Sequence, residues 1–248
     1  MADWKDNTQT QTNFGSVPRA GGAVSYDEGL RSYMLSIYNY MASGVLLTGI
    51  VALLFSWGGE ESIIASLYMS GSPLIWVIKL APLAFILAMS FGLNKMSQTT
   101  LQIVFWAFAA VMGMSISTIF LVYTGESIAT TFFATAGAFA GLSLWGYTTK
   151  KDISGWGSFL IMGVIGLIIA SIANWFIGSG PLALVISGLG VLIFAGLTAY
   201  DTQRLKNDYQ YLRGTEFMGK AVIMGATSLY LDFVNMFLFL LQFLGSRE

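Results

Sequence analysis

Seven long apolar stretches constrain the fold of this 248-residue chain more than any other feature of its sequence. A helix needs about 20 mostly apolar residues to cross the hydrocarbon core of a bilayer. Only 10% of the residues are charged, which is too few to cover a surface that faces water. The sequence therefore predicts an all-α integral membrane protein, a bundle of seven transmembrane helices at approximately 33–57, 74–94, 100–123, 126–148, 158–178, 181–203 and 218–244.

The lengths and separations of these stretches favour one helical domain. Runs this long are typical of helices, whereas the strands of a membrane barrel alternate over about ten residues. The connections are short and rich in turn-forming residues, so no soluble domain fits between the helices. Residues 1–30 are polar and have no sustained apolar period, which predicts a disordered cytoplasmic tail before one membrane domain over residues 31–248.

The lysines and arginines lie almost entirely on one side of the predicted bundle. All but two of the 12 fall before the first helix or around the connections that follow the second, fourth and sixth helices. The exceptions are Arg247, after the last helix, and Lys79, near the start of the second. Cytoplasmic connections carry the excess of lysine and arginine, so we expect the N-terminus in the cytoplasm and the C-terminus outside.

Histidine and cysteine are both absent, which limits the chemistry of the chain. Their absence excludes disulfides, zinc sites made of cysteine and histidine, haem bound by histidine, and Ser-His or Cys nucleophiles. The carboxylates, amides and hydroxyls that remain suit Ca²⁺ or H⁺, and we expect no cofactor. The net charge of −1 gives no indication of a nucleic-acid partner.

Two of the 13 acidic residues fall within predicted membrane helices, apart from Glu126, which is the first residue of its helix. Asp201 lies near the cytoplasmic end of the sixth helix, and Asp232 lies within the seventh. An acid at the centre of an isolated spanning helix costs about 2.5–3.5 kcal/mol, so each side chain should face protein or water. Ser228 and Asn235 fall on the same helix face as Asp232, which indicates a polar face in the bundle interior or along an aqueous pathway.

The sixth and seventh helices are adjacent and antiparallel, so we expect Asp201 and Asp232 to approach each other. Two close carboxylates in a site of low dielectric constant share one proton and titrate as a unit. Loss of that proton would separate the helices or recruit a cation, which makes the pair a candidate pH gate and a weak, transient Ca²⁺ site. Two alternatives stay open. Asp201 could form a local ion pair with Arg204, and Asp232 could belong to a hydrogen-bonded seam with no transport role.

In these two segments the chain resembles the Bax inhibitor family. The resemblance rests on AYDTQ at 199–203, SLYLDFVNMF at 228–237, EGLR at 28–31 and the seven-helix layout. It implies a central seventh helix wrapped by the other six, and a pH-sensitive Ca²⁺ leak governed by two aspartates that match Asp201 and Asp232. Many members of the family are bacterial, which implies a location in the bacterial inner membrane.

The resemblance also raises the question of a latch. Bacterial relatives have an arginine near the cytoplasmic end of the second helix, which pairs with the acid of the sixth helix in the closed state. The corresponding stretch here, SFGLNKMSQ, contains no arginine. The candidate latch cations are therefore Lys95, a weaker monodentate partner, and Arg204 of the sixth helix itself.

Two other functions compete with a leak. Some bacterial members of the family are regarded as substrates or modulators of a membrane protease, and the polar tail would then contact that protease. Deleting residues 1–30 should abolish such modulation but leave a leak unchanged. Intramembrane aspartyl proteases also use two membrane aspartates. Neither Asp201 nor Asp232 has their GxGD-type surroundings, so we do not expect an enzyme.

Overall fold

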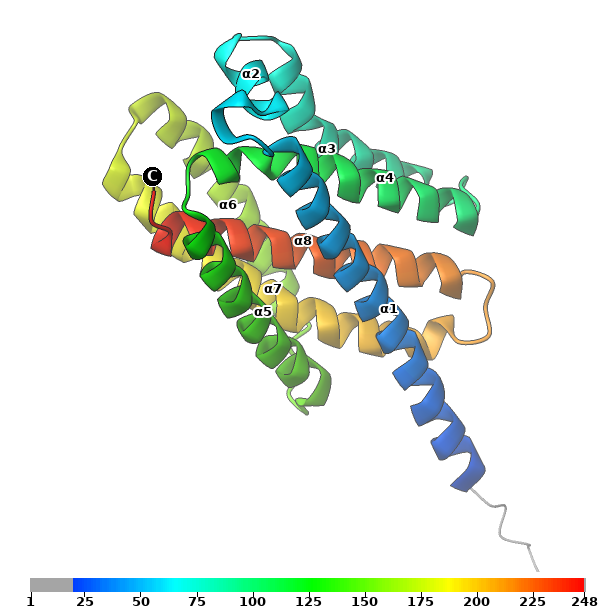
Figure 1. Cartoon of the computed structure of the whole chain (residues 1–248). Coiled ribbons are helices and arrows are strands. Elements are labelled where there is room, and N and C mark those ends of the chain that lie inside the picture. Colours follow the sequence, from blue (N-terminus) through cyan, green and yellow to red (C-terminus); the bar gives the residue numbers. More distant parts are fainter. Residues whose placement is uncertain (1–19, 248) are drawn as a thin grey trace, which may run out of the picture.

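The structure is a computed structural model that describes residues 20–247, and these residues form helices without a strand (Figure 1). Seven of the described helices are long and apolar enough to cross a membrane, which confirms the predicted seven-helix bundle. In chain order the elements are α1 (Ala20–Phe55), η1 (Gly59–Glu61), α2 (Ile63–Met69), α3 (Leu74–Gly92), α4 (Gln98–Ile116), η2 (Ser117–Leu121), α5 (Gly125–Thr148), α6 (Trp156–Ile177), α7 (Gly180–Leu212) and α8 (Met218–Leu244).

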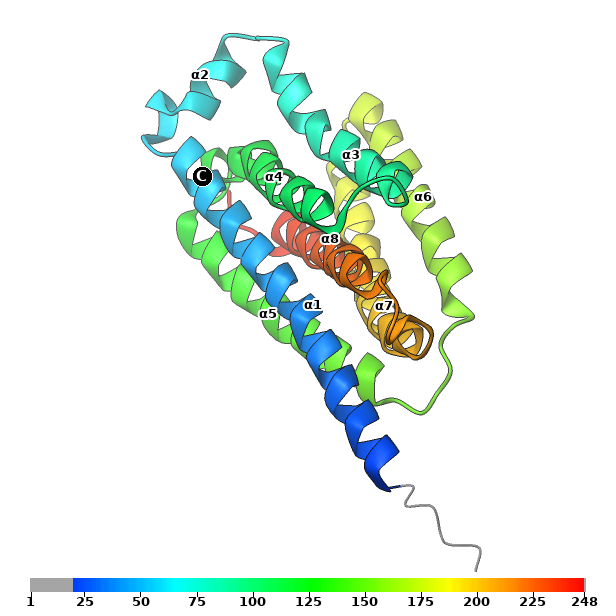
Figure 2. The ribbon, with the colours of Figure 1, turned by 90° about the vertical axis from the view of Figure 1, so that its right-hand side faces the viewer.

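Helix α8 lies at the centre of the bundle, as the resemblance implied (Figures 1 and 2). It packs directly against α1, α4, α5 and α7. Helix α3 packs mainly against α4, and α6 mainly against α7, so these two form an outer layer rather than wrapping α8 themselves. One polar contact in this core joins three helices: the Thr48 hydroxyl lies 2.7 Å from the Tyr230 hydroxyl and donates to the Ala109 carbonyl at 2.8 Å.

Two helices extend beyond the bounds predicted from hydropathy. Helix α1 begins at Ala20, so residues 20–30 of the expected tail are helical; the rest of the expected tail, residues 1–19, lies outside the described residues. Helix α7 continues to Leu212 instead of ending near 203, because Leu205 and Tyr209 keep a buried face after the apolar run has ended. Only residues 213–217 therefore connect α7 to α8.

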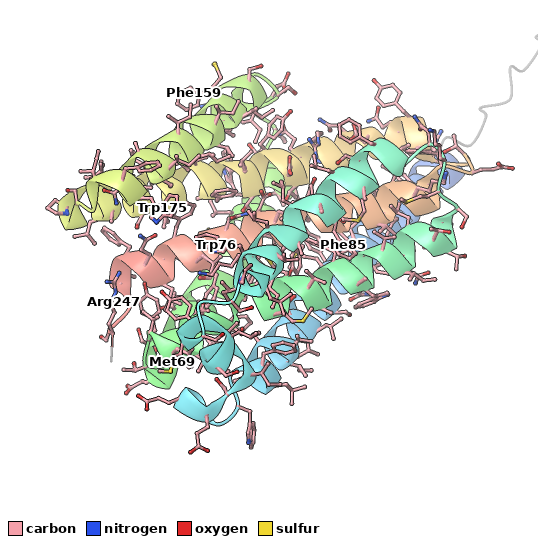
Figure 3. The ribbon with its side chains drawn as sticks, turned by 90° about the horizontal axis from the view of Figure 1, so that it is seen from above. Met69, Trp76, Phe85, Phe159, Trp175 and Arg247 are labelled. Carbon is pink, nitrogen blue, oxygen red and sulfur yellow. The ribbon has the colours of Figure 1, made fainter. Side chains whose placement is uncertain are left out.

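The outer faces of the bundle carry large apolar side chains, as expected for contact with lipid (Figure 3). Trp76 of α3 and Trp175 of α6 are both exposed, with ring centroids 6.0 Å apart. Inside, α5 approaches α7 so closely that a Cβ at Gly146 would overlap the backbone of Ala199. This close crossing fixes the segment of α7 that carries Asp201.

Candidate functional site

The two aspartates predicted from the sequence both lie inside the bundle. Asp201 on α7 is 6% exposed and Asp232 on α8 is 4% exposed. These helices form an antiparallel hairpin and pack along their length. The charges of Asp201 and Arg204 both act on the Asp232 carboxyl, so the two acids belong to one electrostatic site.

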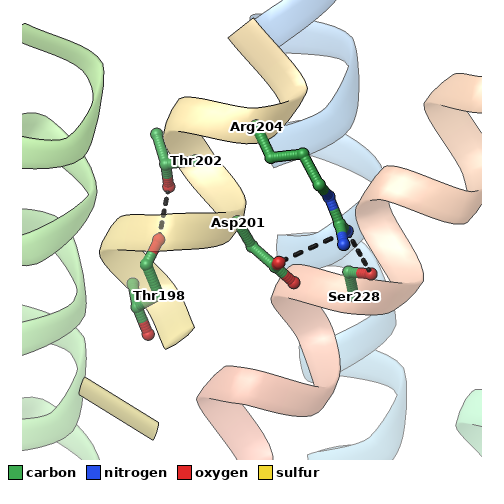
Figure 4. A network of polar contacts seen from close by, with 5 residues as sticks. All are labelled: Thr198, Asp201, Thr202, Arg204 and Ser228. Atoms are coloured by element: carbon green, nitrogen blue, oxygen red, sulfur yellow. Dashed lines mark hydrogen bonds and ion pairs between the residues drawn. The ribbon is translucent and has the colours of Figure 1, made fainter. Parts of the chain in front are cut away.

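Arg204 connects the two helices at this site (Figure 4). Its guanidinium forms an ion pair with Asp201 Oδ1 at 3.3 Å, and its Nη2 donates to Ser228 Oγ on α8, also at 3.3 Å. Arg204 also lies over the Tyr200 ring, 5.8 Å from its centroid. The structure therefore contains the Asp201–Arg204 ion pair that was one of the alternatives for Asp201. Arg204 also contacts Ser228, a residue of the predicted polar face of α8.

Asp232 has a different environment. Its Oδ2 atom is buried and has no hydrogen-bond partner among the described residues. Nearly all buried polar atoms in proteins are paired, and an orphaned one costs about 1–3 kcal/mol. The alternative of a satisfied hydrogen-bonded seam thus does not describe this carboxyl oxygen.

A second polar chain borders α7 on the side of α5. The Tyr38 hydroxyl lies 2.6 Å from Ser143 Oγ, which lies 2.8 Å from Thr202 Oγ1. The hydroxyls of Thr202 and Thr198 each donate to the carbonyl four residues earlier on α7, and Figure 4 shows the Thr202 bond. This hydroxyl chain joins α1, α5 and α7 beside the acidic site.

The other predicted site residues, Asn235 and Lys95, have different surroundings. Asn235 is half-buried, and its amide donates to the Leu231 carbonyl of its own helix at 2.8 Å. Lys95 is exposed in the connection between α3 and α4. A different lysine, Lys220 at the start of α8, donates to the Leu93 carbonyl at 3.2 Å and ties α8 to the end of α3. Of the two candidate latch cations, Arg204 is the one that contacts Asp201.

A cavity of about 480 Å³ lies beside this site, between α1, α7 and α8. Its walls include Arg204 and Ser228, together with two residues that the sequence analysis did not single out, Tyr33 and Asp208. Among residues 20–247, no three carboxylates gather as they do in a tight metal site.

The polar ends of the helices also contain a clamp that the sequence analysis missed. Gln203 Oε1 accepts the backbone N–H of Ile153 at 2.9 Å, and Gln203 Nε2 donates to the Lys151 carbonyl at 2.8 Å. Lys206 donates to the Tyr147 carbonyl at 2.7 Å. Both residues follow Asp201 closely on α7, so the α5–α6 connection holds this end of α7 in place.

Comparison with known proteins places the sequence in a family. Residues 30–248 match the family described as "Inhibitor of apoptosis-promoting Bax1". An uncharacterized protein of Rickettsia prowazekii is 46% identical over 90% of this chain and 93% of its own length. The inner membrane protein YbhL of Escherichia coli is 40% identical over 93% of this chain and 98% of its own length.

Proposed function

The chain belongs to the Bax inhibitor-1 family of membrane proteins, and we propose that it forms a proton-sensitive pathway for Ca²⁺ gated by Asp201 and Asp232. Arg204 acts as the latch of the closed state, and Ser228 and Asn235 line the pathway. Ca²⁺ is the transported ion and binds the two carboxylates weakly. The protein is not an enzyme, because neither aspartate has the sequence surroundings of an intramembrane protease.

One observation carries this proposal: the buried Asp232 carboxyl has an oxygen without a hydrogen-bond partner, and the charge of a second buried acid, Asp201, acts on it. Removing a buried ion from water is costly unless it is paired. Arg204 contacts Asp201 and leaves Asp232 to be satisfied by something else. A shared proton would do so in the closed state and a cation in the open one.

The expected direction of gating follows from the charges. With one proton between them, the two carboxyls hold α7 and α8 together. When the proton leaves, two negative charges repel each other in a poorly hydrated site. Acidic pH therefore favours the closed state, and a rise in pH favours Ca²⁺ passage.

The test replaces Asp232 by asparagine, which keeps the shape of the side chain but cannot ionise. Full-length protein is reconstituted in liposomes that contain a Ca²⁺ dye, and the initial flux is measured across a range of pH. We expect Asp232→Asn to lose the pH dependence, while Asp152→Asn, in the exposed α5–α6 connection, keeps it. An unchanged pH profile in Asp232→Asn would show that the gate is assigned to the wrong residue.

The orientation and location belong to the same proposal. The excess of lysine and arginine near the α7–α8 turn supports an N-terminus in the cytoplasm and a C-terminus outside. The name of the E. coli relative supports the inner membrane as the location. The cavity beside Arg204, which reaches residues of the α7–α8 turn, would then open toward the cytoplasm.

A further inference from the structure

We propose that Asp208 and the Tyr33 hydroxyl form a second cation site, which holds a hydrated cation in the cavity before it reaches Asp201 and Asp232. The order of transfer rests on the proposed function. The site itself stands on the geometry of the cavity.

The cavity between α1, α7 and α8 is large enough for an ion with its water. Its volume is about 480 Å³, whereas one water molecule occupies about 30 Å³ in the liquid. Two of its lining residues are charged, Arg204 and Asp208, and Tyr33 and Ser228 also line it. The cavity therefore has these polar side chains in a wall that also contains apolar residues of α7 and α8.

The Tyr33 hydroxyl indicates that this pocket holds a ligand. Tyr33 is 1% exposed, and its hydroxyl has no hydrogen-bond partner among the described residues. Its ring packs against Tyr209, with centroids 5.4 Å apart, so the side chain is held in place. The charges of Asp208 and Arg204 act on the hydroxyl, although neither residue hydrogen-bonds to it. A group that bridges Asp208 and Tyr33 would give this hydroxyl the partner that it lacks.

Asp208 is available to bind that group. It is half-buried, and it makes no ion pair within the part of the chain that the structure describes. Arg204, the nearest cation on the same helix face, is already engaged with Asp201 and Ser228. A carboxylate and a phenol oxygen provide two of the six to eight oxygens that Ca²⁺ takes, so water supplies the rest and binding is weak.

The spacing along α7 connects this site to the gate. Asp201, Arg204 and Asp208 recur at three and then four residues, which places them in one row on the helix. A cation held at Asp208 would repel the Arg204 guanidinium and weaken its ion pair with Asp201. Cation binding at Asp208 would therefore help to open the gate at Asp201 and Asp232.

The experiment measures binding without transport. Full-length protein in detergent is titrated with Tb³⁺, which replaces Ca²⁺ and emits when a nearby tyrosine absorbs light. We expect Asp208→Asn to weaken the tyrosine-sensitised Tb³⁺ binding about tenfold, in the range seen when a group that supports a metal is removed. Asp208→Glu should restore it, and Asp152→Asn, an exposed acid of the α5–α6 connection, should not change it.

A Tyr33→Phe variant protects the conclusion against misfolding, because it removes a single oxygen and keeps the ring packing. It should also raise the Tb³⁺ concentration at the midpoint of the titration; the midpoint is compared and not the brightness, because the substitution removes a tyrosine that sensitises the emission. If wild-type protein binds no Tb³⁺ that depends on Asp208, or if both variants titrate like wild type, the second site does not exist. That outcome would leave the proposed gate untouched, since the pH dependence of flux through Asp232 is measured separately in liposomes.

Discussion

Replacing Arg204 by glutamine should increase the Ca²⁺ leak, because Arg204 is the side chain that joins the acid of α7 to the polar face of α8. It contacts Asp201 and Ser228, each at 3.3 Å. Glutamine removes the charge but keeps a polar side chain that tolerates a half-exposed helical position. The prediction is that the closed arrangement loses stability relative to the open one.

The size of the effect follows from the exposure of the pair. The Arg204 side chain is 42% exposed and that of Asp201 is 9% exposed. A fully exposed ion pair contributes about 0–1 kcal/mol, whereas breaking a fully buried one costs about 3–5 kcal/mol. This half-buried pair with long contacts should lie between these limits, at about 1–2 kcal/mol. That free energy changes a two-state ratio about 5–30-fold.

The assay is the initial Ca²⁺ flux into dye-loaded liposomes at acidic pH, where the closed state should dominate, normalised to the amount of inserted protein. Arg204→Lys keeps the charge but loses the planar, two-point geometry, so its leak should be intermediate. The matched control is Lys206→Gln, two residues further on α7, whose amine contacts the Tyr147 carbonyl of α5 instead of the acidic site. An Arg204→Gln leak no larger than that of Lys206→Gln, in protein that remains folded, would refute the latch.

Two further predictions concern the fold and its orientation. Gly146→Val should lower the free energy of unfolding by about 1–3 kcal/mol, because the valine side chain would overlap the Ala199 backbone. Gly137→Ala on the same helix meets no atom within 4 Å and should be tolerated. Thermal unfolding in detergent measures both variants, and equal melting temperatures would contradict the close crossing of α5 and α7. The chain has no cysteine, so a single introduced cysteine shows on which side of the membrane its position lies. Ser246→Cys should react with an impermeant maleimide added to intact cells, and Ser154→Cys should react only after permeabilisation. The reverse pattern would contradict the proposed orientation.

Hydropathy predicted the seven spans but placed the ends of two helices wrongly, and the reason is physical. A hydropathy window detects contact with lipid, which ends on α7 near Asp201. Helix formation continues wherever one face stays buried, and Leu205 and Tyr209 supply that face as far as Leu212. The helical start of α1 at Ala20 was missed in the same way, because residues 20–30 lack a long apolar run.

The candidate site was predictable only in part. Asp201 and Asp232 stand out because acids inside apolar spans are rare, and Arg204 was a candidate because it follows Asp201 by three residues. Asp208 falls between residues 203 and 218, where hydropathy predicts a connection between two helices. Tyr33 has no sequence feature that distinguishes it from other aromatic residues of the core. The three-then-four spacing of Asp201, Arg204 and Asp208 was a signal available in the sequence once α7 was known to continue. The missing partner of the Tyr33 hydroxyl depends on α1, α7 and α8 together, and no local pattern reports it.

The Arg204 guanidinium interacts electrostatically with three carboxyl groups of α7 and α8. The charge of Arg204 acts on Asp201, Asp208 and Asp232, but its ion pair is with Asp201. Asp208 faces the cavity, where water and ions can reach it, whereas Asp232 is buried with an unpaired oxygen. These differences separate the expected phenotypes. Changes at Asp208 should alter how the protein responds to cation concentration, changes at Asp232 should alter how it responds to pH, and changes at Arg204 should alter both, because moving one charge changes the balance at every acid that it serves.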